Sequence, residues 1–256
     1  MKFYLGTHVI NHMEKTSVPL FMSIRQLRKR KKKPFKQLGE IAIDSGGFTE
    51  LKMFGGWKTT PIEYVEDLKR LQNLGLEISW ASPQDWMVEE IMLKKTGLTV
   101  KEHQKRTVEN LIELRSLTKE IHFIPVLQGQ TIDDYFNHFE MYEEANFNLR
   151  NEKIVGVGSV CRRQSSDEIG SIMKALSSKN LNLHGFGVKK GGISKYGDHL
   201  FSSDSLAWSF GARYSKKRCS KCQKMKKPTS KNCANCLQYA LEWRESIITR
   251  IDTRTV

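Results

Sequence analysis

The chain has 256 residues, and its 42 lysines and arginines outnumber its 28 acidic residues, which gives a formal net charge of +14. We expect no membrane span, because no run of about 18 or more apolar residues occurs, and no signal peptide, because Met1 to Gly6 lack an apolar core and a cleavage site. Four of the five cysteines share a metal-type spacing, which argues against a disulfide framework and indicates a reducing compartment such as the cytoplasm.

Short apolar segments predict eight strands, and the amphipathic segments between them predict helices. The predicted strands cover residues 3–9, 40–43, 76–80, 121–127, 153–157, 181–186, 199–202 and 208–214. Their near-continuous apolar character is typical of parallel strands covered by helices.

Three of the predicted helices carry start signals. Residues 60–63, 99–102 and 165–168 each place Thr or Ser at the N-cap and Glu three residues later, which is a capping box. The first of them also has Pro61 at the first helical position, where proline is favoured. A last helix is predicted over 237–251.

This alternation of strands and helices fits either an open doubly wound sheet or a closed barrel, and eight repeats favour the barrel. A barrel of this kind takes about 250 residues, which is nearly the whole chain. We therefore predict an α/β protein with a (β/α)8 TIM barrel as a single domain over residues 1–256. Residues 215–237 are expected to form a zinc-binding insertion between the eighth strand and the last helix.

The insertion is predicted from the cysteine spacing C-x2-C-x10-C-x2-C, formed by Cys219, Cys222, Cys233 and Cys236. Four thiolates in two paired loops suit the tetrahedral coordination of structural Zn²⁺ and leave no ligand position open. The seven histidines show no H-E-x-x-H pattern, which argues against a catalytic zinc site of that type. The fifth cysteine, Cys161, stands beside Arg162 and Arg163, and adjacent arginines lower the pKa of a thiol, but a small buried residue is the favoured interpretation.

Basic residues gather in two clusters, one over residues 25–33 and one around the cysteines over residues 216–231. Such clusters attract a phosphate backbone through counterion release. Solvated basic loops are the plainer interpretation, but two separate clusters favour a nucleic-acid partner.

Two aspartates end predicted strands. Asp44 precedes Ser45-Gly46-Gly47-Phe48, and Asp204 lies between two serines. Taken alone, the first pattern is more often a structural turn, and the second fits a helix N-cap equally well. At the mouth of one barrel, however, they supply a nucleophile and a general acid/base, the pair that exchanges groups at a sugar anomeric carbon.

An ordered series of motifs resembles the tRNA-guanine transglycosylase superfamily, and most closely its DNA-acting branch, the deazapurine DNA modification (DpdA) family. The motifs are Asp44 to Phe48, Val126 to Gly129, Val155 to Ser159, His184 to Val188 and Ser203 to Ser205, followed by the cysteines. Ala81 to Met87 and Ser203 to Trp208 are similar to motifs of the DNA-acting branch. The likeness covers about residues 3–251.

The resemblance implies a role for each aspartate. Asp204 matches the nucleophile that attacks C1′ of the sugar while guanine leaves. Asp44 matches the acid/base that protonates the departing guanine and later deprotonates the incoming 7-deazaguanine. The exchange needs no nucleotide cofactor, and the resemblance implies structural zinc as the metal.

The resemblance also implies a set of substrate-binding residues, in which Phe48 stacks on the base, Gln128 reads the base edge and His184 walls the pocket. The full set is Ser45, Gly47, Phe48, Asp85, Gln128, Gly156, Val157, Gly158, His184 and Gly185. The base-reading aspartate of the tRNA enzymes falls at Ser79, so Asp85 is the candidate to replace it.

The expected activity is exchange of guanine in DNA for a 7-deazaguanine of the preQ0 type. Guanine exchange in tRNA is the alternative, although this chain is shorter than a typical tRNA enzyme and has four cysteines where those enzymes include a histidine. A non-catalytic zinc-containing nucleic-acid-binding protein is a third interpretation, which the presence of both aspartates disfavours. The sequence leaves open whether a partner protein takes part.

Overall fold

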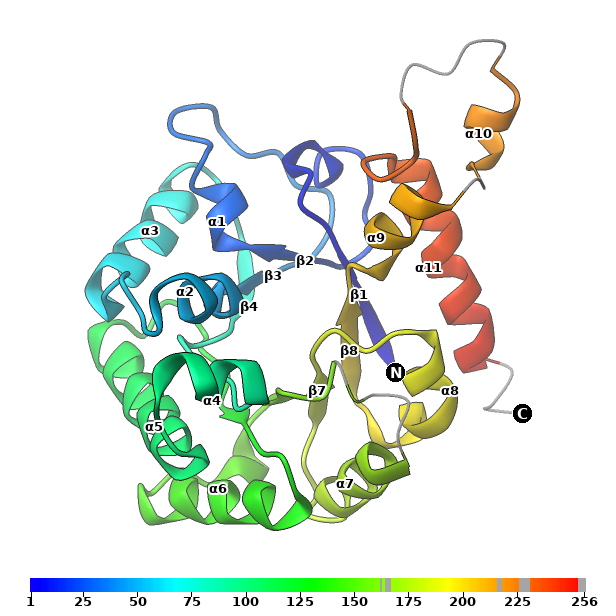
Figure 1. The fold of residues 1–256 in the computed structure, drawn as a ribbon. Coiled ribbons are helices and arrows are strands. Elements are labelled where there is room, and N and C mark those ends of the chain that lie inside the picture. The colour runs from blue at the N-terminus through cyan, green and yellow to red at the C-terminus, as the bar shows by residue number, and fades with distance from the viewer. Residues whose placement is uncertain (162, 164–166, 216–217, 226–230, 253–256) are drawn as a thin grey trace.

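Eight parallel strands form one curved sheet, and helices cover its outer side (Figure 1). The computed structural model describes all residues except 162, 164–166, 216–217, 226–230 and 253–256. The strands are β1 Lys2–Gly6, β2 Leu20–Ser23, β3 Ile41–Asp44, β4 Ile78–Ala81, β5 Val126–Leu127, β6 Val155–Val157, β7 Leu183–Gly185 and β8 Ser202–Ser205. Their order across the sheet is β4-β3-β2-β1-β8-β7-β6-β5.

The two edges of this sheet meet through a single parallel bridge between Ala81 and Phe123. The amide of Ala81 donates to the carbonyl of His122 at 2.9 Å, and the amide of Ile124 donates to the carbonyl of Ala81 at 3.1 Å. The continuous ladder is therefore a curled half-barrel of eight parallel strands rather than a fully hydrogen-bonded closed barrel.

Helices follow most of the strands. They are α1 Ile24–Leu27, α2 Gly47–Phe54, α3 Pro61–Asn73, α4 Glu90–Thr96, α5 Val100–Leu117, α6 Ile132–Glu144, α7 Asp167–Ser177, α8 Lys190–Tyr196, α9 Ala207–Tyr214, α10 Ser220–Gln223 and α11 Leu237–Asp252, with 3-10 turns η1 Ile10–His12, η2 Leu149–Asn151 and η3 Gly197–His199. None of the described helices is both long enough and apolar enough to span a bilayer.

The predicted capping boxes at Thr60 and Thr99 are confirmed, since each threonine accepts from the backbone of the glutamate three residues on. A third box at Thr131, closed by Asp134, begins α6 and was not predicted. The predicted box at 165–168 begins outside the described residues, and α7 is described from Asp167.

Two strand assignments made from sequence were wrong, and the strand predicted over 199–202 lies three residues further on, as β8. The segment 208–214 is not a strand but lies in α9, whose buried residues Trp208, Ser209 and Ala212 have helical spacing. The missing eighth strand is β2, which has four residues and is paired on both sides by β1 and β3. Short apolar runs do not separate strand from helix by periodicity alone, which explains both errors.

Alternation along the strands produces two cores. Residues of the convex face, such as Leu5 and Ile43, pack under the helices. The concave face carries a second cluster that is rich in aromatic rings: Tyr4, Phe21, Ala42, Trp80, Ile124, Val126 and Ile154, with Phe186 against it. The indole of Trp80 donates to the hydroxyl of Tyr4 at 3.0 Å, and its ring centroid lies 4.9 Å from that of His184. We call this cluster the aromatic floor, because it fills the inner side of the sheet.

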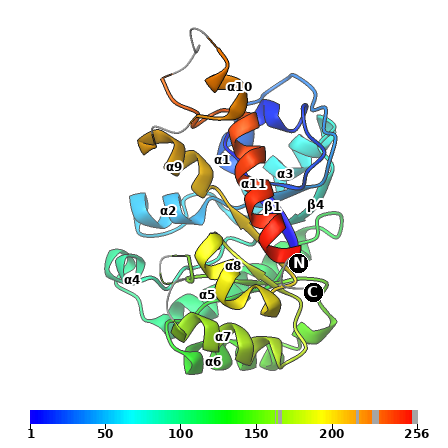
Figure 2. The same cartoon turned by 90° about the vertical axis from the view of Figure 1, so that its right-hand side faces the viewer.

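The helices α2, α4 and α9 lie together on one side of the molecule, away from the amino terminus of β1 (Figure 2). The helices α2 and α9 begin shortly after the carboxyl ends of β3 and β8. This end of the sheet is therefore where residues that follow the strands converge.

Candidate active site

A cavity of about 440 Å³ opens at the carboxyl ends of the strands. Seven of the residues proposed from sequence line it: Asp44, Gly47, Phe48, Asp85, Gln128, Gly158 and Asp204. They come from β3 and α2, from segments that follow β4, β5 and β6, and from β8. The sheet thus brings residues that are distant in sequence to one site. Ser79, by contrast, is exposed in β4 and is not among the residues that line the cavity.

The other five proposed binding residues do not line the cavity, for reasons set by strand geometry. Successive residues of a strand point to opposite faces of the sheet. Gly158 faces the cavity, so Val157 before it, and Gly185 paired with Val157, face the outer core. Ser45 is buried behind the site, where its amide donates to Oγ of Ser82 at 2.9 Å.

Gly156 and His184 point inward but lie deeper in the sheet. They are paired in register between β6 and β7. A Cβ on Gly156 would lie 2.5 Å from the ring of Phe186, so this glycine makes room for the aromatic floor. His184 is fully buried in the same layer. Both residues therefore support the cavity from below.

The carboxylate of Asp204 is held in a fixed orientation. Its Oδ1 accepts from the amide of Gly187 at 3.0 Å and lies 3.3 Å from Nε2 of His184. The Nδ1 of His184 in turn lies 2.9 Å from Oγ of Ser202, one layer below. Asp204 is 6% exposed, so water reaches it mainly through the cavity. The arrangement aims a carboxylate into the cavity from a rigid strand.

The second aspartate, Asp44, has a pKa above its ordinary value. Burial is the largest cause, and the nearby charge of Asp204 adds to it, while hydrogen bonds from Ser23 and the amide of Gly46 oppose it. A carboxyl group whose pKa is raised holds its proton more readily, as a general acid must. Gly46 turns the chain at φ +83°, where a Cβ would also meet the Arg25 side chain at 2.8 Å.

A chain of polar groups crosses the cavity from the third carboxyl, Asp85. The amide nitrogen of Gln128 donates to Oδ2 of Asp85 at 2.5 Å, and its oxygen lies 2.6 Å from the hydroxyl of Ser159. That hydroxyl also lies 3.1 Å from Oε2 of Glu89. Burial, followed by the charge of Asp44, raises the pKa of Asp85 to about 7.

This polar chain depends on close backbone approach. A Cβ on Gly158 would lie 2.3 Å from the amide of Gln128, so only glycine admits that side chain. Ser159 adopts φ +56°, an uncommon conformation for a residue other than glycine, and its hydroxyl accepts from the amide of Val88 at 3.0 Å. Neither Glu89 nor Ser159 was proposed from sequence. Ser159 stood at the end of a recognised motif, whereas nothing in the sequence marked Glu89.

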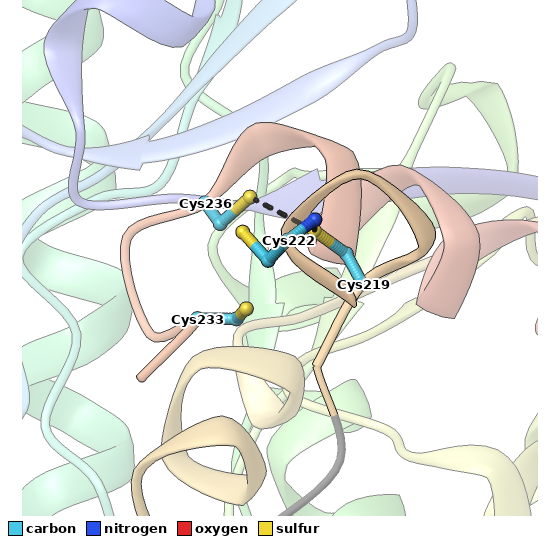
Figure 3. A group of neighbouring side chains, drawn as sticks. All are labelled: Cys219, Cys222, Cys233 and Cys236. Atoms are coloured by element: carbon cyan, nitrogen blue, oxygen red, sulfur yellow. Dashed lines mark hydrogen bonds between the residues drawn. The ribbon is translucent and has the colours of Figure 1, made fainter. Parts of the chain in front are cut away.

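The four proposed metal ligands are brought together between α9 and α11 (Figure 3). Their sulfur atoms lie within 4.8 Å of one another, and those of Cys219 and Cys236 are 3.6 Å apart. Thiolates about 2.3 Å from one tetrahedral ion would lie about 3.8 Å apart. The amide of Cys222 also donates to the sulfur of Cys219 at 3.4 Å. Both the donor set and its spacing fit a tetrahedral metal ion.

The first basic cluster divides into arginines that pair within the fold and lysines that face solvent. The pairs are Arg25 with Glu50 at 3.0 Å, Arg28 with Asp67 at 2.5 Å and Arg30 with Glu14 at 2.9 Å. Arg30 is only 9% exposed, whereas Lys31 to Lys33 are exposed. The lysines are thus the part of this cluster that is accessible to a partner.

The structure describes half of the lysines and arginines of the second cluster, including Arg218 and the exposed Lys221, Lys224 and Lys231. The guanidinium of Arg218 donates to the carbonyl of Lys231 at 2.9 Å, which ties the two sides of the cysteine loop together. The predicted contributions of Lys216, Lys217, Lys226 and Lys227 lie outside the described residues.

A curved parallel sheet with several carboxylates gathered at the carboxyl ends of its strands is the arrangement of an α/β enzyme. The family model DpdA, described as DeoxyPurine in DNA protein A, matches residues 1–255. The chain therefore belongs to the DpdA family, within the tRNA-guanine transglycosylase superfamily. The description of this family names a deoxypurine in DNA.

The other comparisons add little. No curated protein matches the chain. Among solved structures, a candidate isomerase from Sinorhizobium meliloti in an open-loop conformation is similar, with a TM-score of 0.40 and 10% sequence identity. The match covers 80% of this chain and 50% of that protein, so the chain spans about half the length of that neighbour. A likeness at this level carries no argument about function.

Proposed function

We propose that the chain is a DNA-guanine transglycosylase that replaces guanine in DNA with a 7-deazaguanine of the preQ0 type. The observation that carries the proposal is that Asp44, Asp85 and Asp204 line one cavity together with Gln128. Its volume, about 440 Å³, lies in the range of small-molecule sites. We further propose that residues 1–256 act as one domain in which the bridge at Ala81 and Phe123 completes a (β/α)8 barrel.

In the proposed first step, a carboxylate oxygen of Asp204 attacks C1′ of the deoxyribose, and the bond from C1′ to N9 of guanine breaks. The bonding electrons leave with guanine, and protonated Asp44 donates the proton that guanine takes up. The raised pKa of Asp44 supports this role, because it favours the protonated carboxyl before attack. The product of the step is an ester between Asp204 and the sugar.

In the proposed second step, Asp44 takes the proton from N9 of the incoming 7-deazaguanine, and N9 attacks C1′. The ester bond to Asp204 breaks, which restores both carboxyl groups to their starting states. The hydrogen bond from the Gly187 amide and the contact with His184 support this cycle, because they keep Asp204 in one orientation through both steps.

Both bases present similar edges to the same polar groups. The ionised carboxylate of Asp85 accepts from N–H donors on the base, and Gln128 supplies one donor and one acceptor. Phe48, which is 37% exposed at the cavity wall, offers a ring on which the base stacks. The proposed binding residues that do not line the cavity shape its wall and floor. These are Ser45, Gly156, Val157, His184 and Gly185.

The four cysteines would hold structural Zn²⁺, which supplies no chemistry to the exchange and fixes the loops between α9 and α11. The exposed lysines would hold the phosphate backbone of DNA. A guanine within a duplex would have to leave the base stack to reach the cavity, as bases do in other enzymes that react with them.

The test offers labelled 7-deazaguanine with duplex DNA in one reaction and with tRNA in another. We expect label to enter DNA, and a covalent enzyme–DNA adduct to appear on a denaturing gel. Asp204→Ala should give no adduct, whereas Asp44→Asn should lower the exchange rate by about 10²–10⁴-fold with near-normal DNA binding. Label in tRNA alone would reassign the substrate, and an undiminished adduct with Asp204→Ala would place the nucleophile elsewhere.

A further inference from the structure

Helix α9 turns an apolar stripe toward solvent. Leu206, Phe210 and Tyr214 follow one another at four-residue spacing, which places them on one side of the helix. Their exposed fractions are 42%, 66% and 76%. The rings of Phe210 and Tyr214 lie 5.0 Å apart at 52°. We call these three residues the α9 ridge.

The ridge begins at the active site. Leu206 lines the cavity and lies two residues after Asp204, so the stripe runs outward from the cavity rim. Surface helices usually turn their apolar stripe inward, and a contiguous exposed apolar surface commonly marks a binding site. The first residue of the ridge therefore forms part of the cavity wall.

The exposure of the ridge is not due to a poorly packed helix. The opposite face of α9 is fixed by the Trp208 indole, which donates to the carbonyl of Gly6 at 2.7 Å, and by Ser209, whose hydroxyl donates to the carbonyl of Ala234 at 2.8 Å. Ala212 packs in one buried cluster with Cys219 and Cys233. The helix thus has its own buried face, and the ridge is an additional apolar surface held rigidly in solvent.

The charge beside the ridge indicates the chemistry of its occupant. Arg213 lies between Phe210 and Tyr214 in sequence and is exposed. Aromatic rings next to cationic side chains suit single-stranded nucleic acid, because bases stack on the rings while the cations hold phosphates.

We propose that the α9 ridge stacks against the bases next to the target guanine in DNA. The inference rests on the proposed function: once the target leaves the stack to enter the cavity, its neighbours lose a stacking partner. Phe210 and Tyr214 replace that partner on the strand that leads into the cavity. Stacking of this kind changes affinity by about tenfold or more for each base.

The test uses a duplex with 2-aminopurine beside the single target guanine, because the fluorescence of this base is quenched when it stacks. In the free duplex the probe is already stacked and quenched, and it should brighten when the target guanine leaves the stack. We expect it to stay quenched on the wild-type enzyme, where the ridge replaces the lost partner, and to brighten on the double variant Phe210→Ala/Tyr214→Ala. The same variant should bind the duplex at least about tenfold more weakly, with a raised KM for DNA and little change in kcat at saturating DNA.

Two further variants separate stacking from general apolar contact. Phe210→Leu keeps an apolar side chain without a ring and should also weaken the quenching. Phe201→Ala is the matched control, because this phenylalanine is 49% exposed but precedes β8, at the opposite end of the strand from Asp204. It should behave as wild type. Since all three side chains are exposed, melting temperature and metal content should be unchanged.

Unchanged quenching and affinity in the double variant would overturn the proposal, as would full quenching by Phe210→Leu or an equal loss with Phe201→Ala. A change in self-association with unchanged DNA affinity would assign the ridge to protein contact, and would overturn it too. Base exchange by the wild-type enzyme distinguishes failure of the ridge proposal from failure of the proposed function. If the wild type incorporates label and the ridge variants match it, the ridge proposal alone fails, whereas no incorporation by the wild type refutes the proposed function.

Discussion

His184 is a positioning residue in our account, because it reaches Asp204 and not the cavity. His184→Phe keeps a ring within the aromatic floor but removes the contact with Asp204 Oδ1. In the described structure this carboxylate oxygen then keeps the hydrogen bond from the Gly187 amide. We expect adduct formation to slow by about 10- to 100-fold, while DNA affinity and the KM for the free base stay within about twofold. Rapid-quench measurement of the adduct tests this. A rate equal to wild type would show that the amide alone orients the carboxylate.

The raised pKa of Asp85 predicts that the KM for 7-deazaguanine depends on pH. This pKa is raised to about 7, so the carboxyl is largely protonated at pH 6 and largely ionised at pH 8. Since the proposed base contact uses the ionised form, the KM for 7-deazaguanine should rise by about tenfold from pH 8 to pH 6. In Asp85→Asn the KM should be high and flat across this range. A wild-type KM that does not change with pH would refute this role.

The same shift affects stability. A carboxyl whose folded pKa lies above its unfolded value stabilises the fold at low pH, and this contribution is lost as pH rises through about 7. Replacing the ionisable group should therefore stabilise the fold more at high pH than at low pH. Asp85→Asn should raise the melting temperature relative to wild type at pH 8 by several degrees more than at pH 5.

At the scale of elements, the first basic cluster contains two kinds of side chain that sequence could not separate. The exposed Lys31 to Lys33 are free of the ion pairs made by the neighbouring arginines in the described structure. Changing these three lysines to glutamine should weaken DNA binding at low salt and make the dependence of log K on log salt shallower by up to about 2.7. Sequence preference should hardly change.

Arg30→Gln is the matched control for the lysines. It removes one charge from the same cluster but also breaks a nearly buried pair with Glu14, so its main effect should be a lower melting temperature. Titrations at several salt concentrations, beside thermal melts, separate the two effects. Equal salt slopes for the triple lysine variant and wild type would exclude phosphate contact by this loop.

The cysteine loop predicts a local effect of metal loss. Cys222→Ser should abolish stoichiometric zinc and loosen the loop from Arg218 to Asn235, because structural zinc contributes roughly 10–16 kcal/mol in small peptides. Metal analysis and limited proteolysis measure both changes. As Ala212 packs on this loop, α9 should become protease-sensitive as well, whereas cuts in α5, far from the loop in Figure 1, should not increase. Soluble, active protein without metal would contradict the structural role.

Sequence reasoning succeeded where local chemistry decides the structure, and failed where distant contacts decide it. The capping boxes at Thr60 and Thr99 are local and both were predicted, although the equally local box at Thr131 was missed. The strand β2 and the helix α9 depend on what packs beside them. Composition alone therefore missed β2 and assigned the residues of α9 to a strand.

The same limit applies to the site. Residues next to strand ends, such as Asp44 and Asp204, were expected at one mouth and do line one cavity. Whether a neighbouring residue faces the cavity or the outer core depends on its parity in the strand, which requires the strand register. Val157 and Gly185 were chosen without it. Glu89 reaches the site through a loop that no motif marks.

At the scale of the whole molecule, the aromatic floor limits how bases can enter and leave. Trp80, Tyr4 and their neighbours fill the sheet beneath the cavity, so a base has the mouth as its path and one place to bind. Guanine released from DNA must therefore depart past the attached sugar before 7-deazaguanine can take its position. Binding of the two bases becomes strictly sequential.

Sequential occupation gives the enzyme ping-pong kinetics. Double-reciprocal plots against DNA at several base concentrations should be parallel, and free guanine should inhibit competitively with respect to 7-deazaguanine. Intersecting lines would show that both bases are bound at once, which this floor does not allow. The cell would then set the rate of modification through its ratio of free 7-deazaguanine to free guanine, with no separate regulatory site required.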